Sequence, residues 1–195
     1  MKKACLLFTL LFVFCSLSSA FAADRPTVLS FTELYSRRLI ELENSTGIDL
    51  SASALGLNHP RIGLDIYSDG LLRGNCSAGT VVFDPKTLSV EGWNGILLFL
   101  NDDPQKTVKS NLQCAVAISA LEYDSNDELT MYGDTPPYLK AYSEIIDPIM
   151  GDIVTTARKL KAQNRSMLIY EGKYDYYISC SETSDGRDMV MIFAE

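Results

Sequence analysis

Histidine is nearly absent from this 195-residue sequence, and its scarcity removes much of the common metal and hydrolytic chemistry. His59 is the only histidine, so a zinc site built on several histidines and the two-histidine H-E-x-x-H pattern are both excluded. His59 lies in the segment Gly56-Leu57-Asn58-His59-Pro60, whose composition favours a turn. We interpret it as a turn residue, and a catalytic base for a serine or cysteine nucleophile is the alternative.

Motifs for an activated nucleophile or a bound metal are missing as well. The sequence contains no G-x-S-x-G, S-x-x-K or C-x-x-C pattern, so neither a serine-hydrolase elbow nor a redox-active cysteine pair is indicated. The densest acidic cluster, Asp124-Ser125-Asn126-Asp127-Glu128, lacks the glycine and the distal glutamate of an EF-hand loop. We interpret this cluster as a solvated loop and expect no metal and no cofactor.

Basic residues are the minority among the charged side chains. The sequence has 17 lysines and arginines against 25 aspartates and glutamates, a formal net charge of −8. An acidic protein without a basic stripe repels phosphate backbones and gains nothing from counterion release. Nucleic acid is therefore not an expected partner.

The one long apolar run of the sequence lies at the N-terminus. Lys2 and Lys3 precede the apolar run from Leu6 to Phe14. The segment then closes with the small residues of Ala20-Phe21-Ala22-Ala23. This order is typical of a cleavable signal peptide, and we predict cleavage after Ala22. An uncleaved signal anchor is the alternative, which the serines at the end of the run disfavour.

Cleavage there divides the chain into a signal peptide at residues 1–22 and a single globular domain at 23–195. The lysine-led signal is typical of bacteria, so the mature protein is expected to be periplasmic or secreted, with no stable membrane anchor after cleavage. Cleavage removes two lysines and no acids, which takes the formal net charge from −8 to about −10. About 173 residues suffice for one domain with a sizeable core.

Three cysteines, Cys76, Cys114 and Cys180, remain in the mature chain. An oxidising compartment allows two of them to form one disulfide, in any of three pairings, and leaves one thiol over. Cys76 and Cys180 lie on predicted strands and can project to one face of a sheet, where we expect a structural bond rather than redox catalysis. Cys114 lies in an apolar helix, as an inert thiol or a disulfide partner.

Hydrophobic periodicity predicts a mixture of helices and strands in separate blocks. Helical spacing indicates helices at about 31–44, 106–122 and 135–162, the first with a Ser30-to-Glu33 capping box and the last restarting at Asp147-Pro148. Period-two alternation and turn signals indicate short strands at 62–67, 71–77, 80–83, 88–90, 96–100, 167–170, 174–180 and 189–193, with turns at Asp69-Gly70 and Gly92-Trp93-Asn94-Gly95. We predict an α+β fold, an antiparallel sheet with about three helices packed mainly on one face.

Aromatic residues supply the most suggestive site candidates. Tyr170, Tyr174, Tyr176 and Tyr177 crowd one predicted hairpin, and Trp93 lies on a predicted turn. Such side chains combine a large apolar area with a polar tip and suit a sugar, peptide or protein-binding surface. Cross-strand packing in an ordinary sheet is the alternative interpretation.

Two functions of different classes follow from these observations. The first is a non-enzymatic binding or protein-interaction domain of the bacterial cell envelope, whose partner is a protein, a peptide or a glycan. The second is a small exported hydrolase that uses carboxylates or a free thiol. The hydrolase requires a concave pocket that holds at least two ionisable groups of perturbed pKa. The binding protein requires instead an exposed aromatic or apolar patch of several hundred Å² without such groups.

Overall fold

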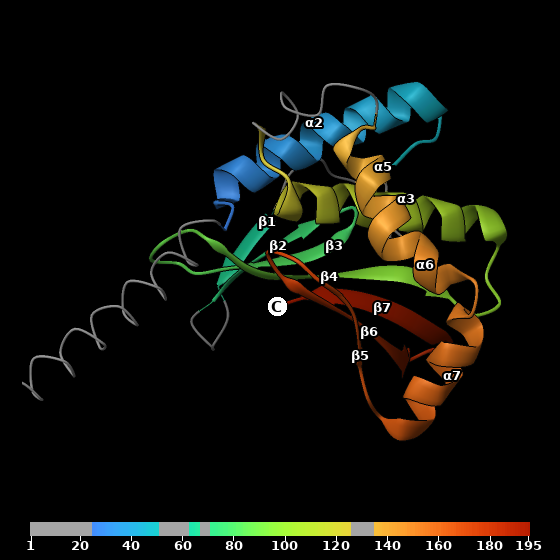
Figure 1. Cartoon of the computed structure of the whole chain (residues 1–195). Coiled ribbons are helices and arrows are strands. Elements are labelled where there is room, and N and C mark those ends of the chain that lie inside the picture. The colour runs from blue at the N-terminus through green and yellow to red at the C-terminus, as the bar shows by residue number, and fades with distance from the viewer. Residues whose placement is uncertain (1–24, 51–62, 67–70, 126–134) are drawn as a thin grey trace, which may run out of the picture.

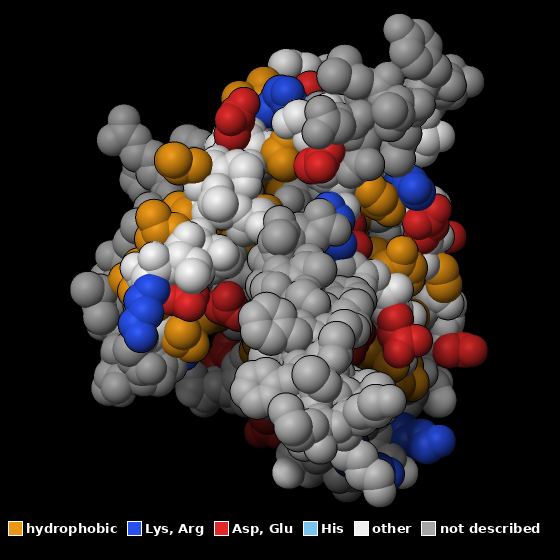
Figure 2. Space-filling view, turned by 60° about the vertical axis from the view of Figure 1, so that its left-hand side comes forward, with side chains coloured by type: hydrophobic (Ala, Val, Ile, Leu, Met, Phe, Trp, Pro, Cys, Tyr) orange, Lys and Arg blue, Asp and Glu red, His pale blue; other side chains and the backbone are white. Residues whose placement is uncertain are grey.

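The protein is described by a computed structural model over residues 25–50, 63–66, 71–125 and 135–195. The predicted signal peptide, His59 and the Asp69-Gly70 turn lie outside these residues, as does most of the Asp124–Glu128 cluster. Within these ranges, no helix combines the length and the apolar character needed to cross a bilayer. On the side of the molecule shown in Figure 2, acidic and basic side chains of the described residues lie interspersed among apolar ones.

A seven-stranded sheet forms the centre of the fold, and every strand pairs antiparallel to its neighbours (Figure 1). Its strand order is β1-β2-β3-β4-β7-β6-β5, so the C-terminal hairpin joins the N-terminal strands through the β4–β7 pair. This confirms the predicted α+β class with an antiparallel sheet. The strands are β1 (Gly63–Ile66), β2 (Leu72–Cys76), β3 (Gly79–Phe83), β4 (Val90–Phe99), β5 (Met167–Glu171), β6 (Asp175–Glu182) and β7 (Asp188–Ala194).

Four helical segments, rather than about three, accompany the sheet in the described part of the chain. They are α2 (Val28–Thr46), α3 (Pro104–Glu122), the continuous run α5 (Pro137–Ala141), η1 (Tyr142–Ile146) and α6 (Asp147–Met150), and α7 (Ile153–Gln163). The π turn η1 ends at Ile146, and α6 begins at Asp147-Pro148, where a restart was predicted. The chain breaks once more after Met150, and α7 begins as a separate fourth helix.

The two faces of the sheet differ in burial because side chains alternate along each strand. One row across four strands consists of Val81, Trp93, Ala194 and Tyr176, which are all buried in the core beneath the helices. We call this side the inner face. The next row, on what we call the outer face, consists of Thr80, Asn94, Phe193 and Tyr177, which are all partly exposed. The helices α2, α3, α5 and α6 lie on one side of the sheet (Figure 1).

Helix α2 confirms the amphipathic helix predicted near residue 31, although it begins earlier. The capping box is formed by Thr27 and Ser30 and not by Ser30 and Glu33. The Ser30 side chain accepts from the Thr27 backbone N–H at 2.9 Å, and Thr27 Oγ1 accepts from the Ser30 N–H at 3.3 Å. Gly47 ends the helix at φ 69°, a left-handed conformation that glycine adopts without strain.

Strand β4 contradicts the turn that was predicted at Gly92-Trp93-Asn94-Gly95. The strand runs unbroken from Val90 to Phe99 through that segment. Close packing, and not a turn, requires glycine at these two positions. A Cβ on Gly92 would lie 2.8 Å from the Ala194 carbonyl oxygen, and one on Gly95 would lie 2.4 Å from the Trp93 ring. The two short strands predicted on either side are therefore parts of one long central strand.

Candidate functional site

The five aromatic site candidates do not share one surface. Trp93, Tyr174 and Tyr176 are buried in the core at 1 % exposure or less. Tyr170 is partly buried against the same core, with its ring centroid 6.0 Å from that of Tyr176. Tyr177 lies on the outer face, stacked on Phe193 at 5.5 Å between ring centroids. Cross-strand packing accounts for their crowding in the sequence.

Glu122, at the end of α3, accepts hydrogen bonds from the β5–β6 hairpin that carries these tyrosines. Its carboxylate accepts from the Tyr176 hydroxyl at 2.8 Å and from the backbone N–H groups of Lys173 and Tyr174 at 2.9 and 3.3 Å. Burial and the neighbouring Glu122 charge hold the pKa of Tyr176 well above its ordinary value. The carboxylate thus fastens the β5–β6 hairpin to α3. Sequence analysis missed this role, for which an acid at the end of an apolar helix is the only signal.

One candidate site is a cleft of about 550 Å³ beside the distal half of β4. Strand β3 pairs with β4 only as far as Thr80, opposite Asn94, while β4 continues to Phe99 along β7. The cleft occupies the space beside β4 beyond that point. Its walls come from the β2–β3 turn, from α3 and from the hairpin that joins β6 to β7.

The floor of the cleft is apolar and belongs to two neighbouring strands. Ile96 pairs with Met191, and Phe99 pairs with Met189, so the four side chains share the outer face. Methionine is flexible and polarisable, which lets such a floor adapt to the shape of a ligand. The strand register therefore builds a continuous apolar strip from residues that are far apart in the sequence.

Polar side chains surround this strip on the β2–β3 and α3 sides. Thr80 Oγ1 donates to Asn75 Oδ1 at 2.8 Å, and Gln113 Nε2 donates to the Leu50 carbonyl at 2.8 Å. Asn94 and Ser110 complete this part of the lining. Amides and hydroxyls held in this way suit the orientation of a ligand more than its chemical activation.

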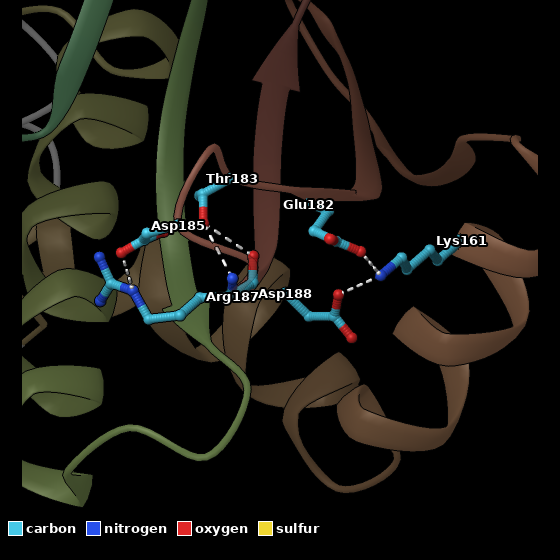
Figure 3. Close-up of polar contacts among 6 residues, drawn as sticks. All are labelled: Lys161, Glu182, Thr183, Asp185, Arg187 and Asp188. Atoms are coloured by element: carbon cyan, nitrogen blue, oxygen red, sulfur yellow. Dashed lines mark hydrogen bonds and ion pairs between the residues drawn. The ribbon is translucent and has the colours of Figure 1, made fainter.

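The hairpin between β6 and β7 forms the remaining wall and carries the charges of the cleft (Figure 3). Arg187 Nε donates to Asp185 Oδ2 at 2.8 Å, and the Arg187 guanidinium carbon lies 4.4 Å from the centre of the Phe99 ring. Hydrogen bonds to Thr183 and Arg187 lower the pKa of Asp185, because both favour the ionised carboxylate. Arg187 also closes the turn, since its backbone N–H donates to Thr183 Oγ1 at 3.1 Å. These contacts give the exposed cationic side chain a preferred orientation.

Helix α7 holds the base of the same hairpin. Lys161 Nζ lies 2.6 Å from Glu182 Oε2 and also contacts Asp188, and these two acids face each other across the start of the hairpin (Figure 3). Both carboxylates raise the pKa of Lys161, so the contact persists at neutral pH. The ion pairs therefore link α7 to the start of the hairpin wall.

The predicted disulfide is wrong: Cys76, Cys114 and Cys180 are all free thiols. Cys76 and Cys180 both project to the inner face, as the favoured pairing requires, but β3, β4 and β7 lie between their strands. With strands about 4.8 Å apart, these cysteines are separated by about 19 Å. A disulfide needs Cα atoms within about 7 Å.

Of the three cysteines, only Cys76 lines the cleft. Burial raises its pKa to about 11, which opposes formation of the thiolate. Cys114 is fully buried, with its Sγ donating to the Ile96 carbonyl at 3.4 Å, while Cys180 is partly exposed. Burial therefore leaves Cys180 as the most accessible thiol.

We expect one of the three thiols in residues 23–195 of the folded protein to react with a maleimide at pH 8, and that thiol to be Cys180. Cys76 and Cys114 are buried, and at a pKa of about 11 roughly one Cys76 thiol in a thousand is ionised at this pH. Mass spectrometry of the folded chain, with Cys180→Ser as the control, checks the assignment. Rapid labelling of the C180S variant at Cys76 would contradict the buried site.

The remaining hydrolytic and metal candidates do not meet at the cleft. Among the residues that line it, the ionisable side chains are Cys76, Asp185 and Arg187. Within the described ranges, no group of three or more histidine, cysteine or acidic side chains is placed to hold a metal ion.

Comparison with known proteins adds no relative to this description. No family model, no curated protein and no solved structure matches the chain.

Proposed function

We propose that this chain is an exported, non-enzymatic binding protein that holds a small ligand with an apolar body in the cleft beside β4. The observation that carries the proposal is the strip of Ile96, Phe99, Met189 and Met191, flanked by hydrogen-bonding side chains. The volume of the cleft, about 550 Å³, lies within the range of about 300–1,000 Å³ that small-ligand sites occupy. The export half of the proposal rests on the order of residues in the N-terminal 22 positions.

Two properties of the lining favour binding over hydrolysis. A nucleophilic thiol needs a lowered pKa, whereas burial raises that of Cys76 to about 11. A general acid or base works best with a pKa near the ambient pH, whereas hydrogen bonds lower that of Asp185 further. The hydrolase that uses carboxylates or a free thiol is therefore the weaker proposal.

The dimensions of the cleft also narrow the choice of partner. A cleft that is closed by a turn, a helix and a hairpin suits a small molecule or the end of a chain better than a broad protein surface. Among the expected envelope partners, we therefore favour a small ligand or a short peptide over a folded protein. Its apolar part would lie on the methionine strip.

Replacing Met191 by lysine is expected to weaken the binding of a neutral apolar probe by roughly tenfold or more. The ammonium group would project into the apolar strip, where a bound ligand has to strip it of water. Fluorescence titration with N-phenyl-1-naphthylamine measures the affinity directly.

Two variants control this titration. Val154 is an exposed apolar residue of α7 outside the cleft, so V154K adds the same charge and should leave probe binding unchanged. M191L keeps the apolar strip and should retain most of the affinity. Absence of probe binding by the wild-type chain, or equal binding by M191K, would refute the cleft as the binding site.

A further inference from the structure

Arg187 is the one basic side chain among the described residues that line the cleft, and it also borders a second, smaller hollow. That hollow has a volume of about 240 Å³ and shares Phe99, Ser110, Gln113 and Arg187 with the cleft. The guanidinium therefore lies where an apolar site meets a more polar one.

The contacts of Arg187 leave one edge of its guanidinium available. Its Nε atom is occupied by Asp185, and its plane is supported by the Phe99 ring. No residue in the described part of the chain makes a hydrogen bond to either terminal nitrogen. Two parallel N–H donors at a fixed edge match the two oxygens of a carboxylate.

The neighbouring charges favour an anion at this position. Lys106 and Lys109 of α3 line the smaller hollow together with Asp102. Across the two hollows, three basic side chains thus oppose two acidic ones, Asp102 and Asp185. This local excess of positive charge stands out on a chain whose formal net charge is −8.

We propose that the ligand of the cleft is an amphipathic carboxylate. Its carboxylate group binds the terminal nitrogens of Arg187, and its hydrocarbon part lies along Met189, Met191 and Ile96. This assignment rests on the proposed binding function of the cleft and adds the chemical class of the ligand. The carboxylate also lies within the reach of attraction from Lys106 and Lys109, which gives the affinity a dependence on salt.

Isothermal titration with decanoate and with decan-1-ol tests the assignment, since the two differ only in the head group. We expect decanoate to bind at least about tenfold more tightly than the alcohol, because hydrogen bonds to charged groups exceed neutral ones in strength. Arg187→Gln should remove that preference, and N-phenyl-1-naphthylamine binding by the wild-type chain reports separately on the apolar cleft. Arg158→Gln, which removes an exposed arginine of α7, should preserve the preference.

The outcomes separate this inference from the proposed function. Equal affinities for the acid and the alcohol, or a preference that survives in R187Q, would overturn the carboxylate assignment while the apolar cleft stands. Binding of the naphthylamine without any binding of decanoate would do the same. If the wild-type chain binds neither compound, both proposals fail. Should R187Q not fold, R187K keeps the charge but loses the paired donors, and it should lower the preference for decanoate.

Discussion

Replacing Glu122 by alanine is expected to lower the free energy of unfolding by about 3 kcal/mol or more. The substitution leaves the Tyr176 hydroxyl and the Tyr174 N–H without their acceptor inside the core, and each buried donor left unsatisfied costs about 1–3 kcal/mol. It also removes the link between the end of α3 and the β5–β6 hairpin. Urea denaturation followed by the fluorescence of Trp93, the only tryptophan, measures the change.

Three further variants give this prediction its controls. Glu171 is exposed on β5, so E171A should change stability by no more than about 0.5 kcal/mol. Tyr176→Phe removes the donor instead of the acceptor, and the double variant closes a thermodynamic cycle. A coupling energy near zero between positions 122 and 176 would contradict the hydrogen bond as the source of the loss.

Local patterns in the sequence predicted the parts of the fold that depend on neighbouring residues. The apolar positions of α2 recur at helical spacing, and Phe31, Leu34 and Leu42 are buried as expected. The strands of the C-terminal half lie close to their predicted bounds for the same reason. The alternation along β6 places Tyr176 and Tyr177 on opposite faces of the sheet.

Strand β4 shows where local patterns fail. An Asn94-Gly95 pair favours a tight turn in an isolated segment. In the protein, β3 and β7 pair with both edges of this segment, and the ladder hydrogen bonds outweigh the turn preference. The same pairing places three strands between Cys76 and Cys180, which no single-strand pattern can reveal.

The cleft could not be predicted from the sequence for a related reason. Its floor and walls together come from four separated segments, which only the sheet register and the packing of α3 bring together. Met189, Met191 and Arg187 belong to an ordinary strand and a polar turn in the sequence. The sequence offered only negative information about the site, namely that the common catalytic motifs are missing from it.

Replacing Gly79 by alanine is expected to have the largest effect on stability, a loss of about 4 kcal/mol or more. Gly79 adopts φ +135°, and a Cβ there would lie 1.9 Å from the Asn94 carbonyl oxygen and 2.8 Å from Gly95 Cα. Both obstructing atoms belong to the backbone, so no side-chain rotation relieves the overlap. The β3–β4 pairing must open beside Trp93, and the end of the cleft opens with it.

Two other glycines separate this clash from the ordinary effects of adding a methyl group. Gly151 has helical dihedral angles and open space around its Cβ position, so G151A should be neutral or stabilising by about 0.4–1 kcal/mol. Gly186 has positive φ but the same open space, so G186A should lose only about 1–2 kcal/mol to backbone strain. The free energies of unfolding of the three variants, measured by urea denaturation, therefore separate the cost of backbone strain from the cost of the steric clash. A G79A variant as stable as G186A would show that β3 can shift away from β4, and the cleft would then have a movable wall.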